Sequence, residues 1–216
     1  MPGVSLEDEF DRQVATLRAT GYPALTQLAG EAFERLVAPL RARLSELELS
    51  VGDGRVPVVI VVSGELAPTD QAIALVDLGG KQGFTDMDAE DLRRFVPIEG
   101  VDVPDGPVYL IVDVDTGADT LSVTPDDAID TIAGQGRSPL TIDEGLALAT
   151  HHPELLRTRN CFSMLGSRCG DRRVTTIWLS KGRPRLGWCW AGAPHTWLGS
   201  ASCGRRVGAK TAVPLP

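Results

Sequence analysis

No stretch of this sequence is long and apolar enough to cross a lipid bilayer. The longest apolar run, residues 56–62, has seven residues, whereas a membrane-spanning helix needs about 20. A positively charged start followed by an apolar segment, the mark of a secretory signal, is also lacking. These two absences predict a cytoplasmic protein that has no membrane partner.

Cysteines are few, and no two of them are close in the sequence. The four are Cys161, Cys169, Cys189 and Cys203, separated by seven, nineteen and thirteen residues. A structural zinc site usually contains a close cysteine pair, because a tight turn aims two thiolates at one ion. The spacing therefore predicts no metal site. If the protein is instead a zinc module for protein contacts, its ligands would come from these cysteines and His195.

The common sequence motifs of enzymes are absent as well. Residues 166–170 do not have the spacing of a Gly-x-Ser-x-Gly nucleophile motif, and residues 79–83 lack essential positions of a nucleotide-binding P-loop. A cysteine nucleophile that uses His195 as its base is a second alternative, since arginines near Cys161, Cys169 and Cys203 would favour the thiolate. The sequence leaves open whether the protein is an enzyme, and it does not indicate a cofactor.

Acidic residues are scarce in the last part of the chain. From residue 151 onward there are eleven Lys and Arg residues against two acids, a local charge of +9, although the whole chain carries −8. Within this part, residues 166–173 combine glycines with Ser167, Arg168, Arg172 and Arg173. Guanidinium groups and free backbone N–H groups both bind phosphate or carboxylate. We therefore expect these four residues, with His195, to bind an anionic small molecule such as a phosphorylated metabolite.

The overall charge argues against nucleic acid as a partner. The first 150 residues carry −17, which opposes the approach of DNA or RNA. The alternative role for the basic part is to pack against the acidic part. We expect no tight nucleic-acid binding.

Apolar periodicity and capping residues predict the secondary structure. Helices are expected at 5–19, along a stripe from 25 to 47 that Pro39 should kink or divide, at 88–95, after Thr124, and from Thr141 to about His151. Strands are expected at 56–62, 71–78, 108–114, 174–179 and 185–190, with the last two joined as a hairpin through 180–184. Helices that precede a mixture of strands and helices indicate an α+β fold.

Three of the four tryptophans lie in residues 187–204. Side chains alternate along a strand, so Trp188 and Trp190 should share one face and Cys189 the other. We expect the two rings to pack together in the core. Pro194 should turn the chain, so that His195 lines a cleft.

Three segments of the second half are similar to a known family. LTIDEGLALATHHPELL, CFSMLGSRCGDRR and IWLSKGRPRLGWCWAGAPHTWLGSASCGRR resemble an uncharacterised actinobacterial family, a domain of unknown function, with the similarity densest from Thr141 to Arg206. The resemblance implies a cytoplasmic bacterial protein. It implies no activity, cofactor or site residue.

Together these observations predict an N-terminal helical extension (1–50) and an α+β domain (51–216). The domain should hold a mixed sheet with helices and a C-terminal β-hairpin. Its basic, Cys- and Trp-rich part should hold the functional region.

Overall fold

The computed structural model describes residues 5–47 and 54–209 of the chain, and the predicted α+β class is confirmed. The α-helices are α1 (Leu6–Thr20), α2 (Tyr22–Leu25), α3 (Gly30–Arg41), α4 (Thr69–Ala72), α5 (Ala89–Arg93), α6 (Pro125–Gly134) and α7 (Ile142–His151). The strands are β1 (Val56–Val62), β2 (Asp77–Leu78), β3 (Lys81–Gln82), β4 (Phe84–Thr85), β5 (Val96–Pro97), β6 (Val108–Val114), β7 (Ser138–Pro139), β8 (Cys161–Met164), β9 (Ser167–Arg168), β10 (Arg173–Ser180), β11 (Arg183–Trp190), β12 (Leu198–Ser200), β13 (Ser202–Cys203) and β14 (Arg205–Gly208). Short 3₁₀ turns lie at Leu44–Glu46, Ile73–Leu75, Ala118–Thr120 and Pro153–Leu155.

The two β-branched runs that the sequence predicts as strands form one antiparallel sheet. β1 pairs with β6 along its length, with Val59 opposite Ile111, and β14 adds to the other edge of β6. Most side chains of β1 and β6 are buried, as expected for a sheet that is covered on both faces.

A second, mixed sheet has the order β12-β8-β10-β11-β4. Its centre is the predicted hairpin, in which β10 and β11 pair antiparallel through a turn at Lys181 and Gly182. Both turn residues have positive φ, 53° and 76°, which is the backbone that a two-residue hairpin needs. The hairpin prediction is confirmed.

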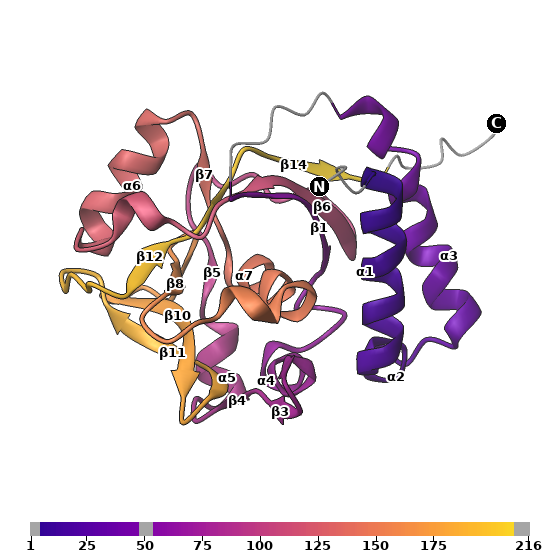
Figure 1. Cartoon of the computed structure of the whole chain (residues 1–216), viewed down its shortest axis with the longest axis horizontal. Coiled ribbons are helices and arrows are strands. Elements are labelled where there is room, and N and C mark those ends of the chain that lie inside the picture. Colours follow the sequence, from indigo (N-terminus) through magenta and orange to yellow (C-terminus); the bar gives the residue numbers. More distant parts are fainter. Residues whose placement is uncertain (1–4, 48–53, 210–216) are drawn as a thin grey trace.

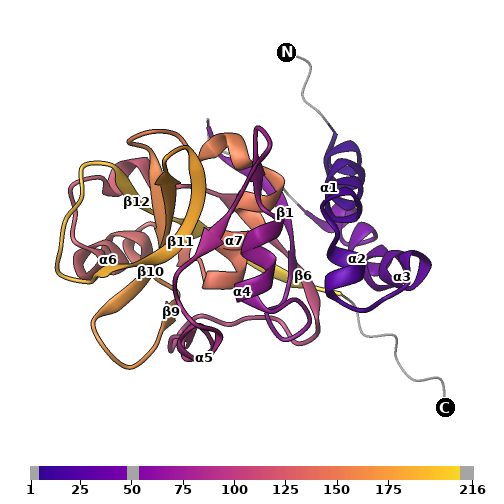
Figure 2. The same cartoon turned by 90° about the horizontal axis from the view of Figure 1, so that it is seen from below.

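Helix α7 lies between the two sheets (Figures 1 and 2). Nearly all of its residues are buried, and the small side chains of Ala147 and Ala149 and the absence of one at Gly145 leave room for close packing. A Cβ atom on Gly145 would come within 2.2 Å of the Met164 side chain. Helix α7 therefore packs closely against β8.

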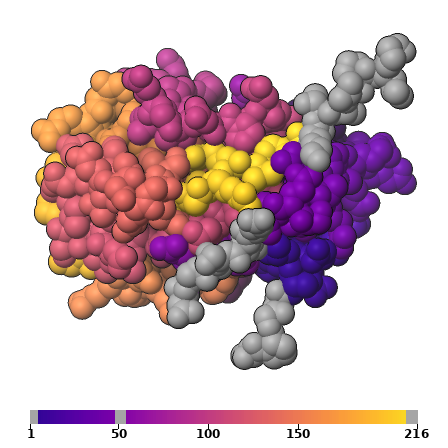
Figure 3. All heavy atoms as spheres, turned by 90° about the horizontal axis from the view of Figure 1, so that it is seen from above, coloured from indigo at the N-terminus to yellow at the C-terminus, as the bar shows by residue number. Residues whose placement is uncertain are grey.

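The N-terminal helices cover the outer face of the first sheet (Figure 1). Phe10 and Leu17 of α1 and Phe33 of α3 belong to the same buried cluster as the strands of that sheet. Figure 3 shows β14, in yellow, at the surface beside these helices. The predicted boundary at residue 50 lies outside the described residues, so the division into two domains stays a prediction.

Two details of the predicted secondary structure are corrected. Residues 71–78 were expected to form one strand, but α4 and a 3₁₀ turn occupy 69–75 and only Asp77–Leu78 is extended. The sequence there is rich in Ala, Gln and Leu, which prefer helices to strands. Pro39 does not divide its helix, because α3 continues to Arg41.

The tryptophan prediction is half right. Trp188 and Trp190 do pack together, with ring centroids 4.8 Å apart. They are not in the core, however, since 38% of Trp188 and 54% of Trp190 is exposed. Both rings lie towards the end of β11, next to the Arg173 side chain of β10 that stacks on Trp188.

Candidate functional site

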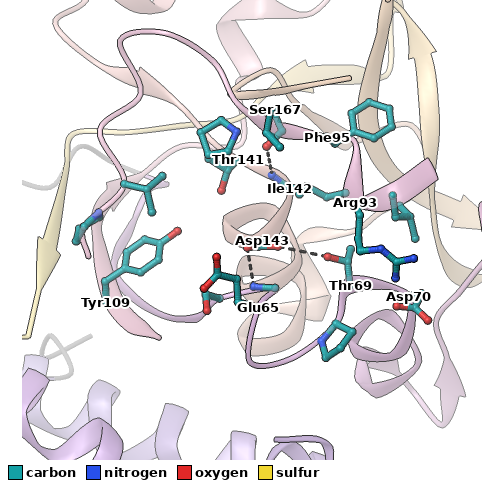
Figure 4. A pocket seen from close by; sticks show the side chains of 18 of the residues that line it. Glu65, Thr69, Asp70, Arg93, Phe95, Tyr109, Thr141, Ile142, Asp143 and Ser167 are labelled. Atoms are coloured by element: carbon teal, nitrogen blue, oxygen red, sulfur yellow. Dashed lines mark hydrogen bonds between the residues drawn. The ribbon is translucent and has the colours of Figure 1, made fainter. Parts of the chain in front are cut away.

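A cavity of about 630 Å³ opens at the N-terminal end of α7 (Figure 4). Its lining comes from segments that are far apart in the sequence: the turn after β1, α4, α5, β5, the loop before β6, β6 itself, the start of α7, and β9. The polar side chains among the lining residues are Ser63, Glu65, Thr69, Asp70, Arg93, Asp105, Tyr109, Thr141, Asp143 and Ser167.

The N-terminus of α7 is fixed by a complete capping box. The Thr141 hydroxyl accepts from the N–H of Glu144, and the Glu144 carboxylate accepts from the N–H of Thr141 at 2.8 Å. Ser167 adds a third bond, since its hydroxyl accepts from the N–H of Ile142 at 3.0 Å. These bonds hold the first turn of α7 in place and satisfy backbone donors that a helix end leaves free.

Asp143 projects from this first turn into the cavity wall. Its carboxylate accepts hydrogen bonds from the N–H of Gly64 at 2.7 Å and from the Thr69 hydroxyl at 3.4 Å. Figure 4 shows the carboxyl between Tyr109 on one side and Thr69 on the other. The turn that follows β1 and the start of α4 therefore position this group.

Asp143 has no cationic partner among the described residues. Burial raises the pKa of its carboxyl above the usual 3.8, and the neighbouring charges of Glu144 and Glu65 add to the rise. A buried carboxylate without a counter-charge is costly when it ionises. A group of this kind that faces a cavity is a candidate for ligand binding or for proton transfer.

Glu144, the next residue, has the opposite surroundings. It forms a buried ion pair with Arg206, with the Arg206 Nε atom 2.6 Å from Oε1 and the Nη2 atom 2.8 Å from Oε2. The Tyr109 hydroxyl also donates to Glu144 Oε1 at 3.1 Å. These bonds satisfy the Glu144 carboxylate inside the fold, so Glu144 has a structural role.

The arginines that the sequence predicts as an anion site do not converge on this cavity. Arg173 forms two short bonds to Asp91, at 2.6 and 2.8 Å, which raise the pKa of Arg173. Arg168 and Arg172 both face Asp126, at 3.9 and 3.8 Å. Among the predicted site residues, Ser167 lines the cavity, while Arg168, Arg172, Arg173 and His195 do not.

The four cysteines are free thiols. Burial raises the pKa of the Cys203 thiol to about 12 and also raises that of Cys161, and Cys169 donates to Asp171 at 3.1 Å. Within residues 5–47 and 54–209, no three His, Cys, Asp or Glu side chains are grouped so that they could hold a metal ion. The zinc alternative stays a prediction, which elemental analysis of the purified protein would test.

No local sequence signal singles out Asp143, which faces the cavity. Residues 141–144 are readable from the sequence as a capping box made by Thr141 and Glu144. The same four residues also include Asp143, whose side chain lines the cavity. In a capping box the Glu side chain turns back towards the helix start, so the preceding Asp must point in another direction. Which groups Asp143 meets depends on Gly64 and Thr69, more than 70 residues earlier in the chain.

The fold and this cavity define a small α+β protein with a ligand-sized cavity at the N-terminal end of its central helix. The chain belongs to a family of unknown function, DUF5701, whose family model matches residues 16–209. This confirms the resemblance to a domain of unknown function. Neither the comparison with curated proteins nor the comparison with solved structures finds a match. None of the described helices has the length and apolar character that crossing a membrane requires.

Proposed function

We propose that the protein binds a small organic cation in the α7 cavity, with the Asp143 carboxylate as its counter-charge. The observation that carries this proposal is the half-buried Asp143 carboxyl, which has hydrogen-bond donors but no cationic partner among the described residues. A positively charged ligand such as an amine would supply that partner. Binding would then stabilise the ionised form of Asp143.

The charge of the cavity lining supports the same ligand class. Its other ionisable residues are three acids, Glu65, Asp70 and Asp105, and one base, Arg93. A cavity lined mainly by one sign of charge raises the local concentration of ligands of the opposite sign. An anion would be repelled by these acids.

The end of α7 is also a poor anion site, although helix N-termini commonly bind anions. The N–H groups of Ile142 and Glu144 already donate to Ser167 and Thr141. An anion that bound to these two N–H groups would have to displace these side chains. A cation needs no such change.

The remaining lining residues suit a small ligand with both polar and apolar parts. The volume of about 630 Å³ lies in the range of about 300–1,000 Å³ that is usual for ligand pockets. The Ser63 hydroxyl is buried and forms no hydrogen bond with a described residue, so it is free to accept from the ligand. Phe95, Val103 and Ile142 provide apolar walls.

Thermal unfolding in the presence of small cations tests this proposal. The probes are putrescine, agmatine and choline, with 1,4-butanediol as the neutral match of putrescine. At a concentration of about 100 times the Kd, a cation that binds should raise the Tm by roughly 5–10 °C. Asp143→Asn should abolish the rise, whereas Asp119→Asn, an exposed residue outside the cavity, should not. An equal rise with 1,4-butanediol, an unchanged response in Asp143→Asn, or no rise with any cation would contradict the proposal.

A second candidate function, anion binding, is favoured by one observation in the basic part. Arg168 is only 18% exposed, yet its guanidinium donates no hydrogen bond to a described residue and has Asp126 at 3.9 Å as its partner. Burial lowers its pKa, which an added negative charge would reverse. Arg172, which is 73% exposed, faces the same carboxylate. An anion at this point could bind both guanidinium groups.

Inorganic phosphate is the probe for this second site. It should raise the Tm of the wild type by a few degrees, and Arg168→Gln should remove that response. Arg205→Gln, which changes an exposed arginine on β14, is the matched control. If the two variants respond equally, Arg168 does not bind the anion.

We also retain the sequence-based proposals of an actinobacterial source, a cytoplasmic location and the absence of nucleic-acid binding. The net charge of −8 supports the last of these. A submicromolar DNA or RNA complex that weakens steeply with added salt would contradict it.

A further inference from the structure

A second hollow, of about 270 Å³, lies on the mixed sheet and has a different chemical character from the α7 cavity. It is lined by Thr176 and Trp178 of β10, Trp188 and Cys189 of β11, and by His195, Trp197 and Leu198. The hollow lies on the face of the hairpin that carries Trp178 and Cys189, so Trp178 and Trp197 contribute their rings to it, whereas the Trp188 ring points to the opposite face of β11.

The position of Trp178 depends on a glycine in the neighbouring strand. Gly187 pairs with Thr176 across β10 and β11, and a Cβ atom on Gly187 would lie 2.6 Å from the Trp178 ring. The ring therefore rests directly against the backbone of β11. The Arg185 guanidinium stacks on the same ring, 5.1 Å from its centre. Gly187 and Arg185 together hold Trp178 as a fixed wall.

The opposite wall is the segment that carries His195. The His195 carbonyl accepts from the N–H of Ser122 at 2.9 Å, and the Trp197 carbonyl accepts from the N–H of Cys161 at 3.0 Å. The imidazole lies 5.5 Å from the Trp197 ring. Its Nε2 atom is buried and forms no hydrogen bond with a described residue. A buried polar atom without a partner costs free energy unless a ligand satisfies it.

We infer that this hollow binds a flat heteroaromatic ring. The ring would stack against Trp178 and Trp197, and one nitrogen at its edge would bond with His195 Nε2. Aromatic side chains favour such stacked or edge-to-face contacts, and the buried, unpartnered Nε2 atom would fix which edge of the ligand faces inward. This inference is independent of the cation proposed for the α7 cavity.

A sugar, which also stacks on tryptophan, fits this hollow poorly. Apart from His195 and the indole N–H groups of the tryptophans, the polar side-chain groups of the lining are the Thr176 hydroxyl and the Cys189 thiol, and these are bonded to each other at 3.3 Å. Most hydroxyls of a buried sugar would lose water without gaining a partner. A heteroaromatic ring has only one or two such groups.

Cys189 gives a direct measure of occupancy. It is half-buried in the hollow, whereas the other three cysteines are buried. Iodoacetamide should therefore alkylate Cys189 first, and a ligand in the hollow should protect it. Intact-mass analysis of the alkylation rate, together with tryptophan fluorescence, reports binding without an assay of activity.

The decisive comparison uses quinoline and indole against naphthalene, which has the size of quinoline but no ring nitrogen. Quinoline or indole should protect Cys189 about tenfold more tightly than naphthalene, the usual effect of one hydrogen bond. His195→Gln should weaken this preference. Trp197→Leu should weaken the binding of all three probes. Trp190→Leu, whose ring lies with Trp188 on the opposite face of β11, should leave binding unchanged.

Gly187→Ala keeps every functional group of the hollow and only displaces the Trp178 ring, so it should also reduce binding. This variant tests the inference even if Trp197→Leu fails to fold. Equal protection by naphthalene and quinoline, protection by methyl glucoside in place of the aromatic probes, or no protection by any probe at millimolar concentration would overturn the inference.

Discussion

Asp143 and Glu144 are neighbours in the first turn of α7, but the two carboxyls meet opposite surroundings. Glu144 is fully buried and bonded to Arg206, Tyr109 and the N–H of Thr141. Asp143 faces a cavity, accepts from Gly64 and Thr69, and has no cation beside it within the described part of the chain.

The two carboxyls therefore have different roles: one stabilises the fold, and the other is available to a ligand. An ion pair that is complete inside the fold holds elements together, here α7 and β14. A buried carboxyl without a counter-charge lowers stability unless a bound ligand balances it. We therefore assign Glu144 to the structure and Asp143 to the ligand.

The largest effect is expected when the pair of Glu144 is broken. Glu144→Gln leaves the Arg206 charge buried without a counter-charge, which should reduce the free energy of unfolding by about 3–5 kcal/mol. Chemical denaturation measures this loss. Glu99→Gln, an exposed residue in a loop, should change stability by less than about 0.5 kcal/mol.

A double replacement sharpens the assignment of Glu144. Glu144→Met combined with Arg206→Met removes both charges and should recover much of the stability that Glu144→Gln loses. If Glu144→Gln alone leaves stability unchanged, the ion pair does not have the structural role assigned to it.

A smaller effect of opposite sign is expected at Asp143. Asp143→Asn removes an uncompensated charge and should stabilise the protein by about 1 kcal/mol at pH 7. The pKa of Asp143 is raised in the folded state, so the stability of the wild type falls as the pH rises from below 3.8 through the folded pKa.

The gain in the free energy of unfolding from Asp143→Asn should consequently be absent at the acid end of this range. It should grow as the pH rises and reach a plateau above the folded pKa of Asp143. Urea titrations of both proteins across this range measure the difference. An advantage that shrinks as the pH rises would contradict the uncompensated charge.

Much of the fold follows from local sequence signals. The runs 56–62 and 108–114 are β-branched and apolar, so they form buried strands wherever they pair. Thr141 and Glu144 supply both halves of a capping box, and the helix begins there. The hairpin turn needs only Lys181 and Gly182 in a positive-φ conformation.

The candidate sites depend on contacts that no local signal contains. Arg206 reaches Glu144, and not Asp143, because β14 pairs with β6 at that register. Asp91 and Asp126 lie far from the arginines of residues 168–173 in the sequence, yet they pair with them. The sequence indicates which residues carry charge, but only the packing of α5 and α6 determines which charges are already balanced.

The most direct test of the account is a pH titration of the Asp143 carboxyl, monitored by carbon NMR. The signal of this carboxyl is assigned by its absence from the spectrum of Asp143→Asn. In the free protein the midpoint should lie above 3.8, the ordinary value for Asp. When putrescine, agmatine or choline is added at a concentration that raises the Tm, the midpoint should fall, because the bound cation stabilises the carboxylate. A midpoint at or below 3.8 in the free protein, or a midpoint that none of these cations lowers, would contradict the account.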